Sequence, residues 1–256
     1  PYLKKDRNQM YNEMNNEIGS QLKNLRERKG LTIERVAYAV DEIPSEVEFW
    51  ESGKLKPCAD AKRKLEFLFS CFGDDHKELA KVNEENYSDF FNYPECVDVP
   101  ENFPSWLKAH GFFAAPASLG HHGNQRGGLY IHSRQVAVEL EKYTRNLGLQ
   151  WNDSRSAWLV GMFHDLCKVD DYCYNWAGDK WEWNKNQILT GHGEKSLIML
   201  QRHITLTEQE IACIRWHMGS FTDQKEWEYY GRAVERYPAV LFTHTADMYA
   251  SHVLGV

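Results

Sequence analysis

Histidine and aspartate side chains that can bind metal ions recur through the second half of the sequence. Each lies in or beside a segment whose apolar residues follow a helical spacing of about three to four. The intervals are about one helix and one loop long, so each helix of a bundle can contribute one inward ligand. A lone histidine is more often an ordinary core or surface residue, and only the ordered set predicts a metal centre. Its six members are His132, His164, Asp165, His192, His217 and Asp247.

This mixture of ligands favours two divalent transition metals. Neutral imidazoles suit Mn, Fe, Co, Ni or Zn, and carboxylates add negative charge and can bridge two cations. Asp165 directly follows a ligand histidine, so we expect it to be the bridge. Two such metals can hold a hydroxide at neutral pH and bind a phosphoryl oxygen. The sequence therefore predicts a dinuclear hydrolytic centre.

The ordered pattern H…HD…H…H…D resembles the HD-domain superfamily of metal-dependent phosphohydrolases, and His192 and His217 resemble its dinuclear branch. The segments FFAAPASLGHHGNQRGGLYIHS, FHDLCK, GHGEKS and IRWHMG are similar to one bacterial and phage-associated HD subfamily. The resemblance covers about residues 104–252. It implies a helical bundle that hydrolyses phosphoester or phosphoanhydride bonds of a nucleotide or short oligonucleotide.

The resemblance also implies roles for residues near the ligands. Lys168 occupies the lysine position of HD-x-x-K, which contacts a substrate phosphate in many HD phosphohydrolases. His122 matches a histidine of the subfamily that can donate a proton to the leaving oxygen or support a ligand. The expected catalytic residues are thus Asp165, Lys168 and His122. Charge and proximity add three candidate phosphate contacts, Arg126, Arg215 and Lys195. Histidines that match no motif position are expected to be structural: His76, His110, His203, His244 and His252.

Residues 172–184 alternate large aromatic side chains around AGDK, which predicts a β-hairpin. Its tryptophans, Trp176, Trp181 and Trp183, can form a lid or a base-stacking wall, or a small hydrophobic plug. The plug is the favoured interpretation. Farther along, Thr207 and Glu210 form the pattern of a capping box at the start of a helix.

The N-terminal segment 18–72 resembles the helix-turn-helix of phage repressors of the Cro/cI type. Its apolar spacing predicts four short helices, with Thr32 as an N-cap. The helix that would enter the major groove offers Glu46, Glu48 and Glu51, and the segment holds ten Lys/Arg against nine Asp/Glu. This near-neutral balance favours dimerisation or protein contact over duplex DNA. A basic cluster keeps the DNA interpretation open: Lys54, Lys56, Lys62, Arg63 and Lys64.

Bulk properties predict a reduced, cytoplasmic protein of two domains. The net charge is -7, and none of the six cysteines forms a C-x-x-C pair. We find neither a signal sequence nor an apolar run near the ~20 residues of a membrane span. The expected fold is all-α, with a helix-turn-helix module followed by a helical bundle that carries the hairpin. The expected divisions are a polar lead-in 1–17, the module 18–72, an acidic linker 73–103 and the metal-binding domain 104–256.

Two other functions are compatible with the sequence. Some HD proteins with the same six-ligand set hold two irons and oxidise a C–H bond with oxygen. The chain could instead be a DNA-binding regulator whose HD domain senses a nucleotide, although the acidic recognition helix opposes this. A phosphate-containing small molecule remains the expected partner of the metal centre.

Overall fold

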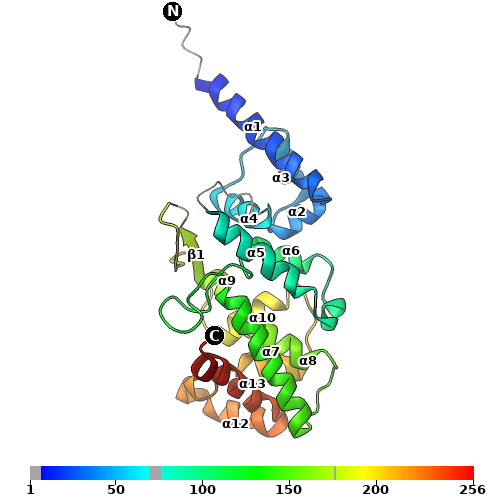
Figure 1. The fold of residues 1–256 in the computed structure, drawn as a ribbon, viewed down its shortest axis with the longest axis vertical. Coiled ribbons are helices and arrows are strands. Elements are labelled where there is room, and N and C mark those ends of the chain that lie inside the picture. Colours follow the sequence, from blue (N-terminus) through cyan, green and yellow to red (C-terminus); the bar gives the residue numbers. More distant parts are fainter. Residues whose placement is uncertain (1–6, 70–75, 176) are drawn as a thin grey trace, which may run out of the picture. The chain divides into compact units, whose positions relative to one another are not determined.

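The structure is a computed structural model that describes residues 7–69, 76–175 and 177–256. This part of the chain is mostly helical, and its one sheet is a two-stranded hairpin (Figure 1). The expected all-α class with a small hairpin is therefore confirmed. The chain divides into two compact units. We call Pro1–Asp75 with Glu101–Gly111 the N-terminal unit, and His76–Pro100 with Phe112–Val256 the C-terminal unit.

Four helices of the N-terminal unit follow the sequence expectation. They are α1 (Arg7–Arg28), α2 (Ile33–Ala39), α3 (Pro44–Glu51) and α4 (Ala59–Phe69). Thr32 caps α2 by accepting a hydrogen bond from the backbone N–H of Arg35 at 3.2 Å. Pro44 opens α3, where its missing N–H costs nothing. Because α1 already begins at Arg7, residues 7–17 of the expected polar lead-in are part of the first helix.

Helices α1 and α3 approach each other closely. A Cβ added to Gly19 would lie 2.3 Å from the carbonyl oxygen of Trp50, so only glycine fits there. The guanidinium of Arg26 donates to both carboxylate oxygens of Glu51, at 2.6 and 2.9 Å. Glu51 therefore stabilises the packing of the module. The apolar core of the module contains Val36, Ala37, Val47, Trp50 and Leu65, which come from α2, α3 and α4.

A short helix from later in the chain completes this unit. Helix α6 (Phe103–Ala109) packs against α2 and α4. Asp41, whose φ is +60°, accepts hydrogen bonds from Trp106 Nε1 and His110 Nε2, both at 2.8 Å. Lys64 Nζ lies 3.0 Å from the same carboxylate. The expected boundary at residue 104 therefore differs from the structure, in which residues 101–111 belong to the N-terminal unit.

The expected acidic linker is in large part ordered structure of the C-terminal unit. Residues 70–75 lie outside the described residues, but α5 (Lys77–Phe90) and the 3₁₀ helix η2 (Pro94–Asp98) follow them. Leu79 and Phe90 are fully buried, and Asn86 donates a side-chain hydrogen bond to the carbonyl of Phe113 at 2.8 Å. The many acidic residues of this segment suggested a linker, although its few apolar residues form one stripe of an amphipathic helix.

The remaining elements form the helical bundle and its hairpin. The helices are α7 (Gly128–Leu147), α8 (Ser156–Phe163), α9 (Lys168–Asp171), α10 (His192–Leu200), α11 (Glu208–Arg215), α12 (Trp227–Arg236) and α13 (Ala239–Met248). Two 3₁₀ helices, η3 (Gly219–Phe221) and η4 (Gln224–Glu226), and the π-helix η5 (Tyr249–Leu254) complete them. The capping box of Thr207 and Glu210 is present at the start of α11.

The hairpin joins β1 (Tyr172–Asn175) to β2 (Lys180–Trp183) in antiparallel register. Tyr172 lies opposite Trp183 and Tyr174 opposite Trp181, and both pairs make edge-to-face ring contacts. The expected hairpin is confirmed, while Trp176 lies outside the described residues.

Helix α7 packs along α8 and also contacts α13 (Figure 1). A Cβ added to Gly161 of α8 would lie 2.3 Å from the Cα of Ala137 in α7. This close approach fixes the spacing of the two helices that carry the first metal-ligand candidates. In the described residues, we find no helix that is both long enough and apolar enough to cross a bilayer.

Candidate metal centre

All six predicted ligands converge in the C-terminal unit, although they come from five separate segments. His132 lies in the first turns of α7, and His164 caps the C-terminus of α8. Asp165 follows in the turn that leads to α9. The remaining three ligands are His192 at the start of α10, His217 just after α11 and Asp247 near the end of α13.

The two carboxylates are the centres of this cluster. Oδ1 of Asp247 lies 3.2 Å from Nε2 of His132 and 3.9 Å from Nε2 of His164. Asp165 lies close to the other imidazoles. Its Oδ1 is 3.5 Å from His217 Nε2 and 3.8 Å from His192 Nδ1, and its Oδ2 is 3.8 Å from His164 Nε2. Asp165 thus lies between two groups of donors, as a bridging carboxylate must.

Three of the histidines are held in the same tautomer. Nδ1 donates to a main-chain carbonyl in each: His132 to Val256 at 2.9 Å, His164 to Gly161 at 2.8 Å and His217 to Ile214 at 2.7 Å. In a neutral imidazole this leaves the lone pair on Nε2. All three Nε2 atoms are buried, and in the part of the chain that the structure describes none makes a hydrogen bond of normal geometry. Buried polar atoms without such bonds are costly, and bound metal ions would satisfy them.

His192 differs from the other three. Its side chain is 38% exposed, and its Nδ1 lies 3.3 Å from the buried thiol sulfur of Cys167. Cys167 was not a candidate in the sequence, because it has no C-x-x-C partner. Two compact sets of donor atoms result, one of His132, His164 and Asp165 and the other of Asp165, Cys167 and His192. They share Asp165.

The electrostatics favour ionised carboxylates at the centre. Burial alone would raise the pKa of Asp247, but His132 and His164 outweigh it and lower this pKa to about 2. Burial opposes ionisation of Asp165 in the same way, yet Lys168 and His164 hold its pKa well below the usual range. Burial lowers the pKa of His164 to about 4, so its imidazole is neutral at pH 7 and available as a ligand.

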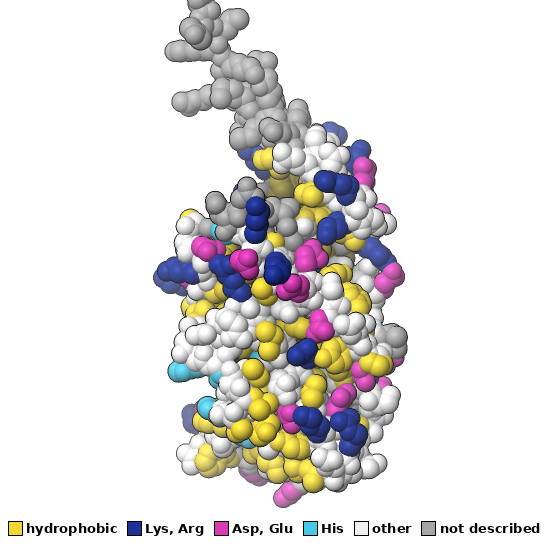
Figure 2. All heavy atoms as spheres, in the orientation of Figure 1, with side chains coloured by type: hydrophobic (Ala, Val, Ile, Leu, Met, Phe, Trp, Pro, Cys, Tyr) yellow, Lys and Arg dark blue, Asp and Glu magenta, His cyan; other side chains and the backbone are white. Residues whose placement is uncertain are grey.

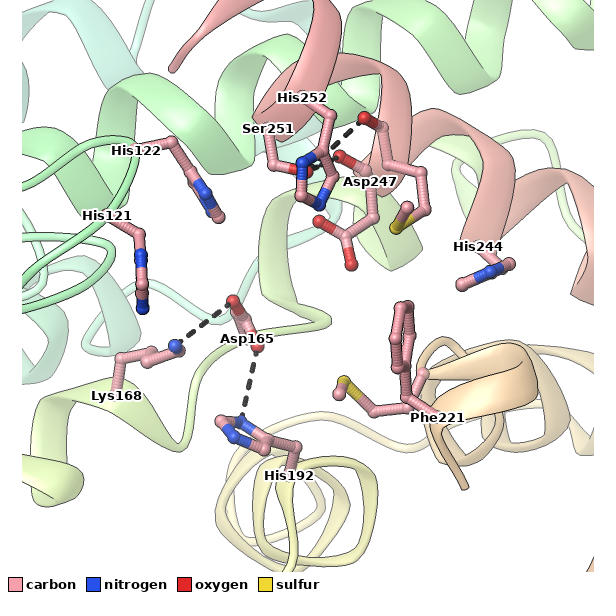
Figure 3. Close-up of a pocket in the computed structure, with 12 residues that line it drawn as sticks. His121, His122, Asp165, Lys168, His192, Phe221, His244, Asp247, Ser251 and His252 are labelled. Atoms are coloured by element: carbon pink, nitrogen blue, oxygen red, sulfur yellow. Dashed lines mark hydrogen bonds and ion pairs between the residues drawn. The ribbon is translucent and has the colours of Figure 1, made fainter. Parts of the chain in front are cut away.

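An open pocket of about 810 Å³ lies over the cluster, a volume typical of small-molecule sites. Lys168, His122, Asp165, His192 and Asp247 face it in Figure 3. Lys168 Nζ is 3.9 Å from Asp165 Oδ2. Burial lowers the pKa of Lys168, but the charge of Asp165 outweighs this and raises it overall. The pocket therefore contains a permanent positive charge beside the carboxylates.

Three further histidines line this pocket, namely His121, His244 and His252. His244 lies three residues before Asp247, and that spacing on α13 was a signal for it. His252 lies five residues after Asp247, a spacing that an α-helix would turn to another side. The chain is π-helical there, which brings His252 to the pocket. His121 had no signal beyond its neighbour His122.

The other phosphate-contact candidates are not among the residues that line the pocket. Lys195 is buried and binds Asp170 at 2.6 Å and Asp171 at 2.7 Å. Arg215 pairs with Glu194 at 2.7 Å and Glu226 at 3.0 Å. The third, Arg126, pairs with Asp179 of the hairpin at 2.8 Å. Each cation is balanced by carboxylates that the chain brings together only on folding.

Three members of the basic cluster of the N-terminal unit are similarly balanced. Lys64 pairs with Asp41 and Asp60, Arg63 pairs with Asp60, and Lys62 lies 3.8 Å from Glu66. Acidic and basic side chains are interspersed over this unit on the face drawn in Figure 2. Such a surface offers little net attraction to a duplex.

Comparison of the chain with known proteins adds no relative. Neither a family model, nor a curated protein, nor a solved structure matches it.

Proposed function

We propose that the C-terminal unit is a metal-dependent phosphohydrolase of the HD type, with two divalent transition metals held by His132, His164, Asp165, His192, His217 and Asp247. One observation carries this proposal. Within the described residues, the buried Nε2 atoms of His132, His164 and His217 make no hydrogen bond of normal geometry, and they lie 3.2 to 3.9 Å from the carboxylates of Asp165 and Asp247. Ligand histidines in metal sites are oriented by hydrogen bonds of their other nitrogen, as here.

Two metals fit these donors better than one. Asp165 belongs both to the compact set with His132 and His164 and to the set with His192, in which the third donor atom is the Cys167 thiol sulfur. A carboxylate is the ligand that bridges two cations. Imidazole and carboxylate together suit Mn, Fe, Co, Ni or Zn. When bound, such a pair supplies a hydroxide nucleophile at neutral pH and neutralises charge on a phosphoryl group.

The chain's own residues would bind and orient the substrate. Lys168 places a fixed ammonium group at the pocket wall, next to Asp165, where it would bind a phosphoryl oxygen. The imidazoles of His121 and His122 lie on the same side (Figure 3) and would hydrogen-bond the remaining oxygens or the leaving group. The substrate class is a phosphoester or phosphoanhydride of a nucleotide or short oligonucleotide, which a pocket of about 810 Å³ can hold.

Metal content measured together with phosphate release tests this function. Wild-type protein purified without chelator should contain about two metal equivalents and release phosphate from nucleotides. Asp165→Ala should lose both, because it removes the proposed bridge. The control is His76→Ala, a histidine of the same unit that binds Asp179 and does not line the pocket.

Three outcomes would oppose the proposal. Equal metal content in wild type and Asp165→Ala would place the metals elsewhere. Bound iron with substrate-stimulated oxygen uptake and no phosphate release would identify an oxygenase. Tight, salt-dependent and sequence-specific duplex binding without turnover would instead identify a regulator.

A further inference from the structure

One wall of the pocket is apolar and accessible. Phe221 is 66% exposed although it is a large hydrophobic residue, and it lines the pocket together with Met218 and Met248. A single exposed phenylalanine is unremarkable on a protein surface. A phenylalanine grouped with two polarisable methionine side chains inside a pocket is a surface suited to a planar apolar group.

Phe221 is held in place by contacts with α13. Gly219, at the start of η3, has a φ of +54°, and a Cβ there would lie 2.5 Å from Cγ of His244. His244 Nδ1 donates to the carbonyl of His217 at 2.8 Å. The His244 ring also meets Phe221 edge to face, with centroids 6.2 Å apart. This contact favours one position of the Phe221 ring at the pocket, which reduces the ordering cost of binding a ligand against it.

The opposite wall is polar. Figure 3 shows His121, His122 and Lys168 on one side of Asp165 and Asp247, and Phe221 and His244 on the other. Lys168 is the cation of the polar wall and lies 3.9 Å from Asp165. A molecule that fills the pocket thus meets positive charge at one end and aromatic and thioether surface at the other.

We propose that Phe221, Met218 and Met248 form a nucleobase subsite, so that the substrate is a nucleoside phosphate and not a phosphorylated sugar or pyrophosphate. The base lies against the Phe221 ring while the phosphate lies toward Lys168 and the carboxylates. The position of the phosphate rests on the proposed phosphohydrolase function, whereas the base subsite rests on the apolar wall alone.

Binding without turnover tests the subsite. The probes are the phosphonate analogues of adenosine 5′-monophosphate and of ribose 5-phosphate, in which a carbon atom replaces the ester oxygen and prevents cleavage. We expect calorimetry on the protein as purified to show tighter binding of the adenosine probe. Phe221→Ala should weaken that probe by about five- to a hundredfold, the usual effect of removing a base-stacking side chain. The ribose probe should change by less than about twofold, because it lacks the base.

Two matched variants separate stacking from general damage. Phe221→Tyr keeps the planar ring and should keep the affinity for the adenosine probe. Tyr229→Ala removes an aromatic ring of similar exposure, 58%, from α12 outside the pocket and should change neither affinity.

The subsite is wrong if wild type binds both probes equally, or binds neither, or if Phe221→Ala binds the adenosine probe as wild type does. Failure of the two proposals is distinguishable. Phosphate release at equal rates from ribose 5-phosphate and adenosine 5′-monophosphate, with kcat/KM unaffected by Phe221→Ala, would retain the phosphohydrolase and remove the subsite. Selective binding of the adenosine probe without any phosphate release would retain the subsite and remove the phosphohydrolase.

Discussion

Nε2 of His132 lies 3.2 Å from Oδ1 of Asp247, so the first and last ligands of the proposed centre meet. His132 is near the start of α7 and Asp247 near the end of α13. The same carboxylate oxygen is 3.9 Å from His164, at the end of α8. The centre therefore depends on how these three helices pack, and a bound metal should in turn stabilise that packing.

Metal addition should raise the melting temperature of chelator-treated wild type. At a metal concentration of one hundred times Kd, the expected shift is roughly 5–10 °C, because ligand binding to the native state stabilises it. Asp247→Ala should show a much smaller increase in melting temperature, because it removes the proposed carboxylate ligand that lies beside His132 and His164. Asp223→Ala, which changes an exposed aspartate of the same unit, is the control. Equal shifts in wild type and Asp247→Ala, measured by calorimetry, would contradict the assignment.

Lys168→Ala should lower kcat/KM for phosphate release by about ten- to a hundredfold, the range for losing a hydrogen bond to a charged group. Its metal content should stay unchanged, because Lys168 is not a ligand. Lys180→Ala removes a lysine that is 63% exposed on the hairpin and should have no effect on turnover. If Lys168→Ala keeps the kcat and KM of wild type, this lysine does not contact the substrate.

Gly161→Ala should destabilise the C-terminal unit by about 1–3 kcal/mol through overpacking and reduce its metal content. The new Cβ would lie 2.3 Å from the Cα of Ala137 and force α8 away from α7. Gly231→Ala is the matched control, because no atom of the described residues lies within 4 Å of the added Cβ. Because Gly231 lies inside helix α12, its replacement by alanine should raise the free energy of unfolding by about 0.5–1 kcal/mol. Thermal unfolding of both variants tests the pair, and equal melting temperatures would refute the packing argument.

Asp41→Asn should make the N-terminal unit less stable at pH 7 and less sensitive to acid. Burial raises the pKa of Asp41, but His110 and Lys64 outweigh it and hold the pKa well below its usual value. The ionised form then adds stability above about pH 4, the unfolded value, and this stability is lost as the pH falls toward the folded pKa. The side chain is 46% exposed, so screening limits the effect to on the order of 1 kcal/mol.

Asparagine tolerates the positive φ of this position and can still accept from Trp106. Urea unfolding at pH 2.5, 4 and 7, followed by tryptophan fluorescence, measures the difference in free energy of unfolding between wild type and variant. The difference should shrink as the pH decreases. A difference that is the same at all three pH values would rule out titration of Asp41 as its source.

The sequence predicted the features that depend on local chemistry. The fold class and hairpin, the caps at Thr32 and Thr207, and the convergence of the six candidate ligands agree with the structure. Helical periodicity and caps depend on neighbouring residues, so one segment is enough to recognise them. The candidate ligand set could be selected because its residue types occur in a characteristic order.

The remaining features depend on long-range contacts. Lys195 and Arg215 were candidates by charge, but whether a cation is free depends on carboxylates such as Asp171 and Glu226 that folding brings near. The assignment of residues 101–111 depends on Asp41, which is distant in sequence from Trp106 and His110. The sequence did not predict helix α5, because its charged residues outnumber the few buried residues on one face.

The pocket depends on the number of residues in the π-helix Tyr249–Leu254 as well as on their types. His252 reaches the pocket only because the wider turn places it beside Asp247, which lies five positions earlier. Deleting one residue there would return the segment to α-helical register and rotate everything beyond it by about 100°. Val256, whose carbonyl accepts from His132, would be displaced as well. Substitutions in this segment should therefore be tolerated better than insertions or deletions.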